Sequence, residues 1–278
     1  MIKIFAFPGA GSSAITYYKW MRFLPESFLI SPIDLPGRGM KSKEEKILKN
    51  DELIDYFFTE IHKKLNGTDD EYVLIGNSFS SILTIQLCDK IEKENRIQNP
   101  KHVFLSVEPP PIILKTRKKI SEDISRKQFI KDVINKFFEN SIISYENREL
   151  ILEFILEKLY NDKKKFLSID ALEIYQTVFG SNSDINSNIL ELINFIIEHL
   201  QLFLEDEDII DKAHKENLAI STDITVFGVI GDIVASENDL KKWSEYTRGI
   251  FRLEMLQGNH TILYDNPELI IRKMKEVL

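Results

Sequence analysis

The chain has 278 residues, of which 43% are hydrophobic and 29% charged, so it is long enough to bury one large core or two small ones. Its formal net charge of -8 argues against nucleic acid or an anionic membrane surface as a partner. Its lone cysteine, Cys88, cannot form an internal disulfide, and the lack of a signal peptide or of ~20 consecutive apolar residues favours a cytoplasmic location.

The first part of the chain alternates short apolar runs with amphipathic segments. The predicted strands are residues 2–8, 28–35, 72–75 and 102–107, and the predicted helices are 51–65, with Asn50 as its N-cap, and 80–93. Glu108 and the three prolines after it end the fourth strand. Strands that alternate with helices in this way predict a parallel sheet covered on both faces.

The pattern changes in the middle of the chain, where residues 115–217 have helical periodicity and no convincing strand. The clearest helical segments are 129–138, 150–159 and 189–204. Strands are predicted again at 224–230 and 251–256, and a last helix begins at Pro267. We therefore expect an α/β core formed by residues 1–111 and 223–278, interrupted by an inserted helical segment at 112–222.

A serine follows the third predicted strand in a context typical of a nucleophile. Residues 76–80 read G-N-S-F-S, which is close to the G-x-S-x-G nucleophile elbow, a strained strand-to-helix turn with the serine at its tip. The last glycine is replaced by Ser80, which is still small. The alternative is that Ser78 is an ordinary helix cap. The strand before and the helix after favour the elbow.

A serine nucleophile requires a base, and the base requires an orienting acid. In an α/β hydrolase these follow in the order serine, acid, histidine, on loops after late strands. Asp232 follows the strand at 224–230, and His260 follows the strand at 251–256. Asp239, the main competing acid, lies where a helix begins. The other histidines are expected to be structural: His62, His102, His199 and His214.

The oxyanion hole requires two backbone N–H groups that point at the developing negative charge. We expect one from Phe79, the residue after the nucleophile, and one from the loop after the first strand, where Ala10 is favoured and Gly9 is second. This loop lacks the spacing of G-x-G-x-x-G and the lysine of a P-loop, which argues against a phosphate site. The acidic run at 205–208 is expected to be a solvated helix end and not a metal site.

Several motifs outside the elbow resemble one family, the type II thioesterases that accompany nonribosomal peptide and polyketide synthases. The loop F-P-G-A-G-S at 7–12 resembles the family's F-P-x-A-G-G/S. The other matching stretches are Trp20, L-P at 24–25 and L-P-G-R at 35–38, F-L-S at 104–106, a weaker match at 169–171 with Tyr175, and finally Gly231, Asp232, Trp243, Thr247 and G-N-H at 258–260.

The chain departs from the family pattern in three places. The family has H-S-M-G at the elbow, where this chain has N-S-F-S, and it has G-G-H where this chain has Asn259 before His260. About forty residues intervene between Tyr175 and Ile224 that the family does not usually have. These differences concern the rate and the substrate, and they leave the order of the three candidate catalytic residues unchanged.

The resemblance implies an α/β-hydrolase fold with a helical lid, and hydrolysis of acyl or aminoacyl thioesters from the phosphopantetheine arms of carrier proteins. Ser78 would attack the thioester, with His260 as its base and Asp232 as the orienting acid. No metal or organic cofactor is expected, because the pantetheine is part of the substrate. We further expect the inserted helices to cover Ser78 and to set acyl selectivity. Two alternatives stay open: another serine esterase, lipase or acyltransferase, and a degenerate, non-catalytic protein that binds carriers.

Overall fold

The structure is a computed structural model that describes residues 1–68, 70–117, 124–139, 141–161, 169–181, 184–211 and 218–278. The chain divides into two compact units, one formed by Met1–Ile120 with Glu205–Leu278 and the other by Ser121–Leu204. Among the described residues, no helix is both long and apolar enough to cross a membrane. His214, predicted to be structural, lies outside the described residues.

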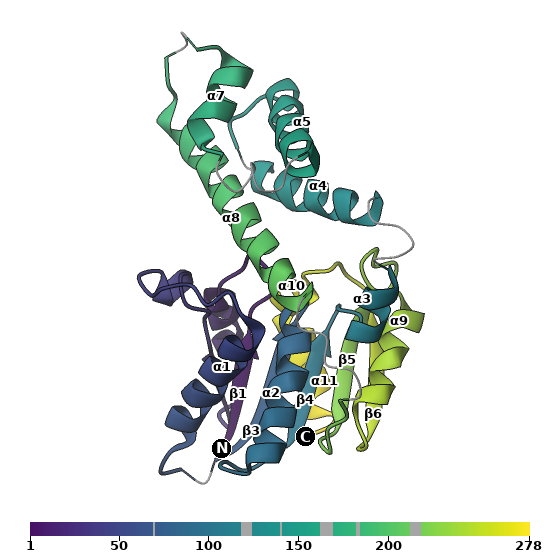
Figure 1. The fold of residues 1–278 in the computed structure, drawn as a ribbon. Coiled ribbons are helices and arrows are strands. Elements are labelled where there is room, and N and C mark those ends of the chain that lie inside the picture. Colours follow the sequence, from purple (N-terminus) through teal and green to yellow (C-terminus); the bar gives the residue numbers. More distant parts are fainter. Residues whose placement is uncertain (69, 118–123, 140, 162–168, 182–183, 212–217) are drawn as a thin grey trace. The chain divides into compact units, whose positions relative to one another are not determined.

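A six-stranded parallel sheet forms the centre of the first unit, as the alternating sequence pattern predicts (Figure 1). The strand order across the sheet is β2-β1-β3-β4-β5-β6. The strands are β1 (Ile2–Phe7), β2 (Phe28–Pro32), β3 (Glu71–Asn77), β4 (His102–Ser106), β5 (Ile224–Val229) and β6 (Phe251–Leu256). All six predicted runs are strands, and only their ends differ. Because the strands are parallel, all their carboxyl ends meet at one edge.

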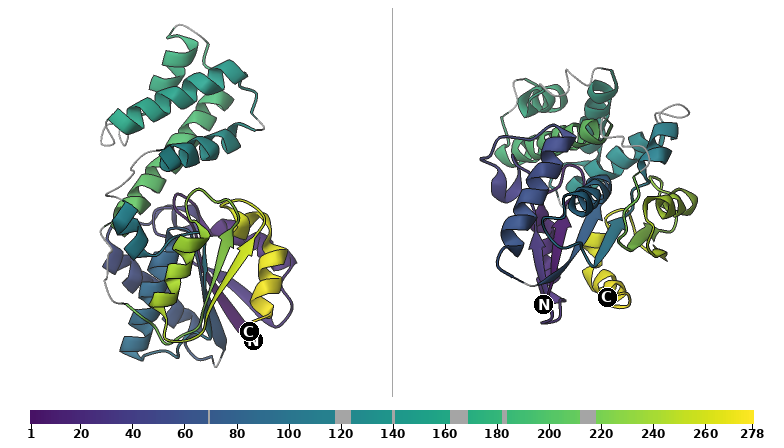
Figure 2. Two further views of the ribbon diagram at one scale, coloured as in Figure 1. Left: turned by 90° about the vertical axis from the view of Figure 1, so that its right-hand side faces the viewer. Right: turned by 60° about the horizontal axis from the view of Figure 1, so that its bottom comes forward.

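Buried side chains cover both faces of this sheet, since successive residues of a strand point to opposite sides. Phe5 and Leu74 pack with helices α1 (Asn50–Leu65) and α2 (Ser80–Glu94), whereas Ile4 and Ile75 pack with η1 (Ala14–Arg22) and α11 (Pro267–Lys275). Figure 2 shows α11 on the face opposite α1 and α2. The remaining helices of this unit are η2 (Gly39–Lys41), α3 (Pro111–Arg117), α9 (Glu237–Lys241), η3 (Lys242–Tyr246) and α10 (Ile262–Asp265).

The predicted cap of helix α1 is wrong by one residue. Lys49 is the N-cap, and it makes no side-chain capping bond, whereas Asn50 is the first helical residue. The Asn50 amide donates a hydrogen bond of 2.7 Å to Oε1 of Gln86 on α2. The side chain that could have capped α1 therefore holds α1 to its neighbouring helix.

The second unit is helical throughout its described residues, as predicted. Its helices are α4 (Ile124–Phe138), α5 (Tyr145–Asn161), α7 (Ala171–Phe179) and α8 (Ser187–Asp211), of which α8 extends into the first unit from Glu205 onward. The segments predicted most clearly lie in α4, α5 and α8. Each helix contributes to a separate buried cluster that includes Ile134, Ile155, Ile174 and Ile196. This unit therefore has a hydrophobic core of its own.

Candidate active site

Ser78 lies on a sharp turn between β3 and α2, with the left-handed φ of 49° that the elbow motif requires. Its N–H donates a hydrogen bond of 2.9 Å to the carbonyl of Ser106 at the end of β4. At Gly76, a Cβ atom would lie 2.7 Å from the carbonyl oxygen of Ser80 and 2.5 Å from Oγ1 of Thr84. Only glycine fits there without a shift of the neighbouring chain, which explains the first glycine of the motif.

Ser80 replaces the last glycine of the motif and is fully buried. Its hydroxyl accepts a hydrogen bond of 2.9 Å from the N–H of Asn77 and lies 2.9 Å from the carbonyl of Phe7, to which it donates. The extra oxygen therefore ties the elbow to the end of β1. The departure from the family motif is accommodated by hydrogen bonds and does not distort the turn.

The three candidate catalytic side chains form one hydrogen-bonded chain. Oγ of Ser78 lies 3.1 Å from Nε2 of His260, and Nδ1 of His260 lies 2.8 Å from Oδ2 of Asp232. The Asp232 side chain is 1% exposed and that of His260 is 14% exposed. With Nδ1–H donated to the carboxylate, Nε2 is the nitrogen that can accept the serine proton.

The loops after the last two strands bring these groups to Ser78. Asp232 follows β5 through Gly231, whose φ of 80° turns the chain sharply. The other oxygen of Asp232, Oδ1, accepts a hydrogen bond of 2.7 Å from the N–H of Val234, which fixes the carboxylate. His260 precedes the short helix α10. Both residues lie at the carboxyl edge of the sheet, as their positions after predicted strands indicated.

The competing acid has a structural role. Asp239 forms a capping box with Ser236 at the start of α9: its carboxylate accepts from the N–H of Ser236, and its own N–H donates to the Ser236 hydroxyl. It was expected to lie at a helix start. Its hydrogen bonds therefore account for this acid without a catalytic function.

Three of the other histidines pack against neighbouring residues. His62 stacks on Phe58, and His199 packs against Phe137 in the second unit. His102 is buried and hydrogen-bonds to Thr225 at 2.8 Å. Burial lowers the pKa of His102 to about 4, so its ring is neutral at physiological pH.

Cys88 is buried, and burial raises the pKa of its thiol, which keeps the thiol protonated. A protonated, inaccessible sulfur is a poor nucleophile. The residue lies on α2 and is part of the hydrophobic core.

The loop after β1 lies against Ser78, and its backbone N–H groups differ in whether they have an acceptor among the described residues. The N–H of Gly9 donates to the hydroxyl of Tyr264 at 2.9 Å, and the N–H of Gly11 donates to Oδ2 of Asp206 at 2.8 Å. Among the described residues, no protein acceptor takes the N–H of Ala10 or of Phe79. A Cβ atom on Gly9 would lie 3.7 Å from Cβ of Ser78. Two unengaged amides therefore flank the nucleophile.

The acidic run at 205–208 was expected to be a solvated helix end, and for Asp206 this is wrong. Asp206 is fully buried, and its carboxylate accepts two hydrogen bonds from Arg38, of 2.6 and 2.7 Å, besides the bond from Gly11. Burial would lower the pKa of Arg38, but the attraction of Asp206 outweighs this effect and raises it. The end of α8 is therefore fastened to the oxyanion loop. The burial of Asp206 depends on its ion pair with Arg38, which lies far away in the sequence, so the acidic run alone does not predict it.

Glu108 is the residue at this site that the sequence analysis did not identify. Its Oε2 atom lies 3.1 Å from Oγ of Ser78, and the residue is 6% exposed. In the sequence, Glu108 marks only the end of the fourth predicted strand. Since β3 and β4 are adjacent and parallel, a polar residue after β4 must lie near the residue after β3. That rule could have identified it.

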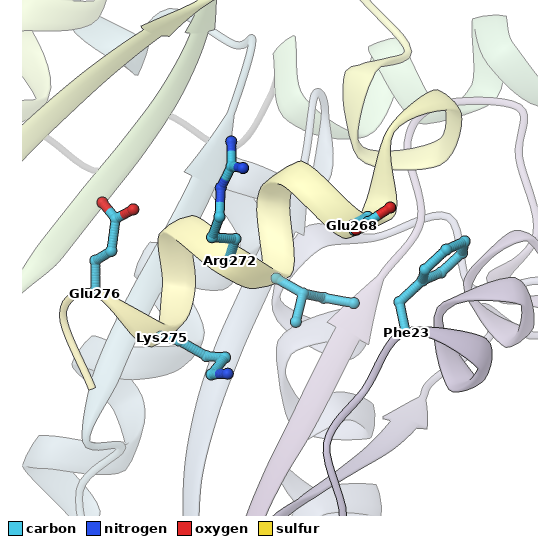
Figure 3. Close-up of a pocket in the computed structure, with 6 residues that line it drawn as sticks. Phe23, Glu268, Arg272, Lys275 and Glu276 are labelled. Atoms are coloured by element: carbon cyan, nitrogen blue, oxygen red, sulfur yellow. The ribbon is translucent and has the colours of Figure 1, made fainter.

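A surface hollow lies elsewhere on the first unit. It has a volume of about 350 Å³ and lies along α11, where Phe23, Glu268, Arg272 and Lys275 line it (Figure 3). None of the three candidate catalytic residues lines it, so this hollow is separate from the candidate active site. Over the described part of the chain, no group of three or more His, Cys, Asp or Glu side chains could hold a metal ion.

Comparison with known proteins identifies one family. The sequence model of the thioesterase domain family matches residues 2–278. Gramicidin S biosynthesis protein GrsT of Aneurinibacillus migulanus is 21% identical over 98% of this chain and 87% of its own length. LgrE of Brevibacillus parabrevis, named a linear gramicidin dehydrogenase, is 20% identical over 100% of this chain and 88% of its own. The solved structure of YbtT, a type II thioesterase from the yersiniabactin NRPS/PKS biosynthetic pathway, has a TM-score of 0.65 at 15% identity, covering 99% of this chain and 92% of YbtT.

Proposed function

We propose that this chain, which belongs to the thioesterase domain family, hydrolyses acyl and aminoacyl thioesters held on the phosphopantetheine arms of carrier proteins. The observation that carries the proposal is the chain of hydrogen bonds from Ser78 through His260 to Asp232 at the edge of a parallel sheet. The type II thioesterase resemblance of the sequence and the pathway named for YbtT support the carrier-bound substrate.

Acylation begins when Oγ of Ser78 attacks the thioester carbonyl and Nε2 of His260 takes the hydroxyl proton. The carboxylate of Asp232 stabilises the imidazolium that forms. The oxyanion accepts hydrogen bonds from the N–H groups of Ala10 and Phe79, which have no acceptor among the described protein groups. Collapse of the intermediate breaks the C–S bond, and His260 returns its proton to the pantetheine thiolate. Ser78 is left as an ester.

Deacylation repeats these steps with water. His260 removes a proton from the water that attacks the ester carbonyl, and the same two amides hold the second oxyanion. Ser78 then leaves with the proton from His260, and the carboxylic acid departs. Every step uses a side chain or amide of the protein, so the proposed reaction requires no metal or organic cofactor, and the pantetheine arrives with the carrier.

The partner we propose is an acylated carrier domain of a synthase. GrsT is named for gramicidin S biosynthesis and YbtT for an NRPS/PKS pathway, which supports a role in clearing or releasing acyl groups in such a pathway. The dehydrogenase name of LgrE gains no support from the residues of this chain. The loop at 8–13 lacks the glycine spacing that cradles a dinucleotide, and Gly9 of this loop lies beside Ser78 instead.

Replacement of Ser78 by Ala tests this function. We expect the rate of acyl release from an acylated carrier protein to fall by at least ~10³, because the triad residues act as a unit. Ser27→Ala, at an exposed serine before β2, is the matched control and should keep the wild-type rate. Full activity of Ser78→Ala would exclude Ser78 as the nucleophile. Failure of the wild type to release any acyl group from carriers would overturn the proposed substrate.

A further inference from the structure

We propose that Asp206 and Tyr264 are positioning residues that aim the Ala10 amide at the developing oxyanion. The inference rests on the proposed thioesterase function, in which the Ala10 N–H binds the oxyanion, and it gives a role to two residues outside the triad. Its starting point is that the amides before and after the Ala10 N–H both have side-chain acceptors. Tyr264 accepts from the N–H of Gly9 at 2.9 Å, and Asp206 accepts from the N–H of Gly11 at 2.8 Å.

The loop makes a tight turn over residues 9–12. The N–H of Ser12 donates to the carbonyl of Gly9 at 3.1 Å, which closes the turn. Gly11 has a left-handed φ of 68°, as the third residue of a type II turn requires. Because a trans peptide is planar, the Gly9 carbonyl and the Ala10 N–H point in opposite directions. The Ala10 N–H therefore points away from the hydrogen bond that closes the turn.

Side chains hold the two peptides that flank the Gly9–Ala10 peptide. The peptide before it donates to the hydroxyl of Tyr264, and the peptide after it donates to Oδ2 of Asp206. Both hydrogen bonds are buried. The peptide between them donates to no acceptor among the described residues. Rotation of this middle peptide would strain or break a buried hydrogen bond on one side or the other, so its N–H keeps one direction.

Both acceptors are held in place by other groups. The Asp206 side chain is 0% exposed, and it accepts hydrogen bonds of 2.6 and 2.7 Å from Arg38. Tyr264 lies on α10, which follows His260, and its ring packs edge-on against Tyr17 with 5.3 Å between the centroids. The turn is thus tied to a buried ion pair and to the helix next to the catalytic base.

Fixed donors stabilise an oxyanion because they do not have to reorient while its charge develops. Removal of one such donor lowers kcat by about 10²–10³ in a serine hydrolase. Loss of an acceptor that holds the turn leaves the donor present but lets it move, so we expect a smaller loss of about tenfold. The bound substrate has no oxyanion yet, so KM should change little.

The test uses two double variants that differ only in the acceptor offered to Gly11. Arg38→Met/Asp206→Asn removes both buried charges and keeps a side-chain oxygen for the Gly11 N–H. Arg38→Met/Asp206→Leu removes the charges and the acceptor, with a side chain of similar volume. Neither leaves a buried charge without its partner. We expect kcat for acyl release from an acylated carrier protein to be about tenfold lower in the Leu variant than in the Asn variant, with KM within about twofold.

The hydroxyl of Tyr264 provides a second, independent variant. Tyr264→Phe removes the acceptor for Gly9 and keeps the ring, so it should also lower kcat by about tenfold at nearly constant KM. Tyr18→Phe, at a tyrosine of η1 that is 47% exposed, is its control and should keep the wild-type kcat. The control for the double variants is Lys46→Met/Glu205→Leu, which removes the neighbouring, more exposed ion pair and should also keep it.

A measurement on the oxyanion itself separates positioning from folding. Oγ of Ser78 adds to the carbonyl carbon of propyl trifluoromethyl ketone, and His260 takes the hydroxyl proton, so that the former carbonyl oxygen becomes the oxyanion of a hemiketal. A ¹³C label at this carbon reports the ionisation of the hemiketal as the pH is varied. We expect the pKa of the hemiketal to be higher in the Leu variant than in the Asn variant, because poorly aimed amides stabilise the anion less.

Three results would overturn the inference. The first is an equal kcat in the two double variants, after correction for the fraction of chains whose Ser78 reacts to completion with a fluorophosphonate. The second is a hemiketal that ionises at the same pH in both. The third is wild-type kcat in Tyr264→Phe, which decides the matter even if the Leu variant does not fold. Because the hemiketal forms without a carrier protein, that measurement separates this inference from a failure of the proposed substrate.

Discussion

The two carboxylate oxygens of Asp232 accept hydrogen bonds from different partners. Oδ1 accepts from the backbone at Val234, at 2.7 Å, and from Ala235 more weakly, at 3.4 Å. Oδ2 is left to accept from Nδ1 of His260 at 2.8 Å. The backbone therefore fixes one oxygen, and the other fixes the tautomer and the direction of the imidazole ring.

We predict that Asp232→Asn lowers kcat by about 10³–10⁴, because an amide that donates to Nδ1 would stabilise the wrong tautomer of His260. Asp239→Asn, seven residues later in the chain, is the matched comparison. It should leave kcat within about twofold and lower the free energy of unfolding by at most about 1 kcal/mol, because only the charge of the N3 side chain is lost and Ser236 stays the N-cap of α9. Steady-state kinetics and urea unfolding of both variants check this. A severe loss of kcat only at position 239 would reverse the assignment of the acid.

The sequence was informative about residues whose role follows from a position after a strand. Ser78, Asp232 and His260 were expected at the carboxyl ends of predicted strands, and the structure brings them together there. Glu108 occupies the same kind of position, but it was predicted only to end the fourth strand with the prolines that follow it. The elbow motif identifies Ser78 from the sequence alone. The position of Glu108 beside Ser78 follows only when β3 and β4 are known to be adjacent strands.

At the scale of elements, the end of α8 and the loop after β1 are joined by a buried ion pair. Arg38 and Asp206 are 6% and 0% exposed in their side chains. Asp206 also accepts from the N–H of Gly11, next to the Ala10 amide proposed for the oxyanion hole. Burial raises the pKa of Asp206, although Arg38 and the Gly11 amide oppose the rise. An unpaired carboxylate at this place would be costly.

We predict that Arg38→Met lowers the free energy of unfolding at pH 7 by about 3–5 kcal/mol, since it leaves the Asp206 carboxylate buried without its cation. Lys46→Met breaks the more exposed pair between Lys46 and Glu205, on the same helix end, and should cost at most about 1 kcal/mol. Urea unfolding of both variants measures the difference.

The pH dependence of the Arg38→Met deficit has a definite sign. Without Arg38, the pKa of Asp206 in the folded protein lies above its value in the unfolded chain. As the pH falls, Asp206 is therefore protonated in the folded state before it is protonated in the unfolded state, and this stabilises the folded state. The deficit should therefore be largest at pH 7 and shrink towards pH 5. A deficit equal to that of Lys46→Met, or one that grows as the pH is lowered, would contradict the account of this pair.

The strands were more predictable than the helix ends. An apolar run in a parallel sheet is buried on both faces, so its composition alone indicates a strand. The cap of α1 was misplaced by one residue because Asn50 bonds across to Gln86. The short helix α7, although its N-cap Asp170 accepts from the N–H of Glu173 at 2.9 Å, was not among the segments predicted most clearly. Contacts with residues distant in sequence determine where such helices begin and end, and a single sequence does not reveal those contacts.

At the scale of the whole molecule, the family match spans residues 2–278 and thus includes both compact units. The helical insertion is therefore part of the matched domain. The role predicted for it, as a lid over Ser78 that sets acyl selectivity, stays a prediction. Helix α8 limits how it can be tested: deletion of residues 181–217 would also remove Asp206 and leave Arg38 buried without its anion.

The most direct test of the central claim is to trap the acyl-enzyme. Wild-type protein is mixed with a propionyl or alanyl carrier protein and quenched in acid within milliseconds to seconds, and the intact mass and the peptide carrying the acyl group are determined. We expect one acyl group per chain, located on Ser78, with accumulation in His260→Ala abolished or greatly slowed. Acyl release that proceeds at the wild-type rate without any acyl group on Ser78, or with the group on another residue, would contradict the mechanism.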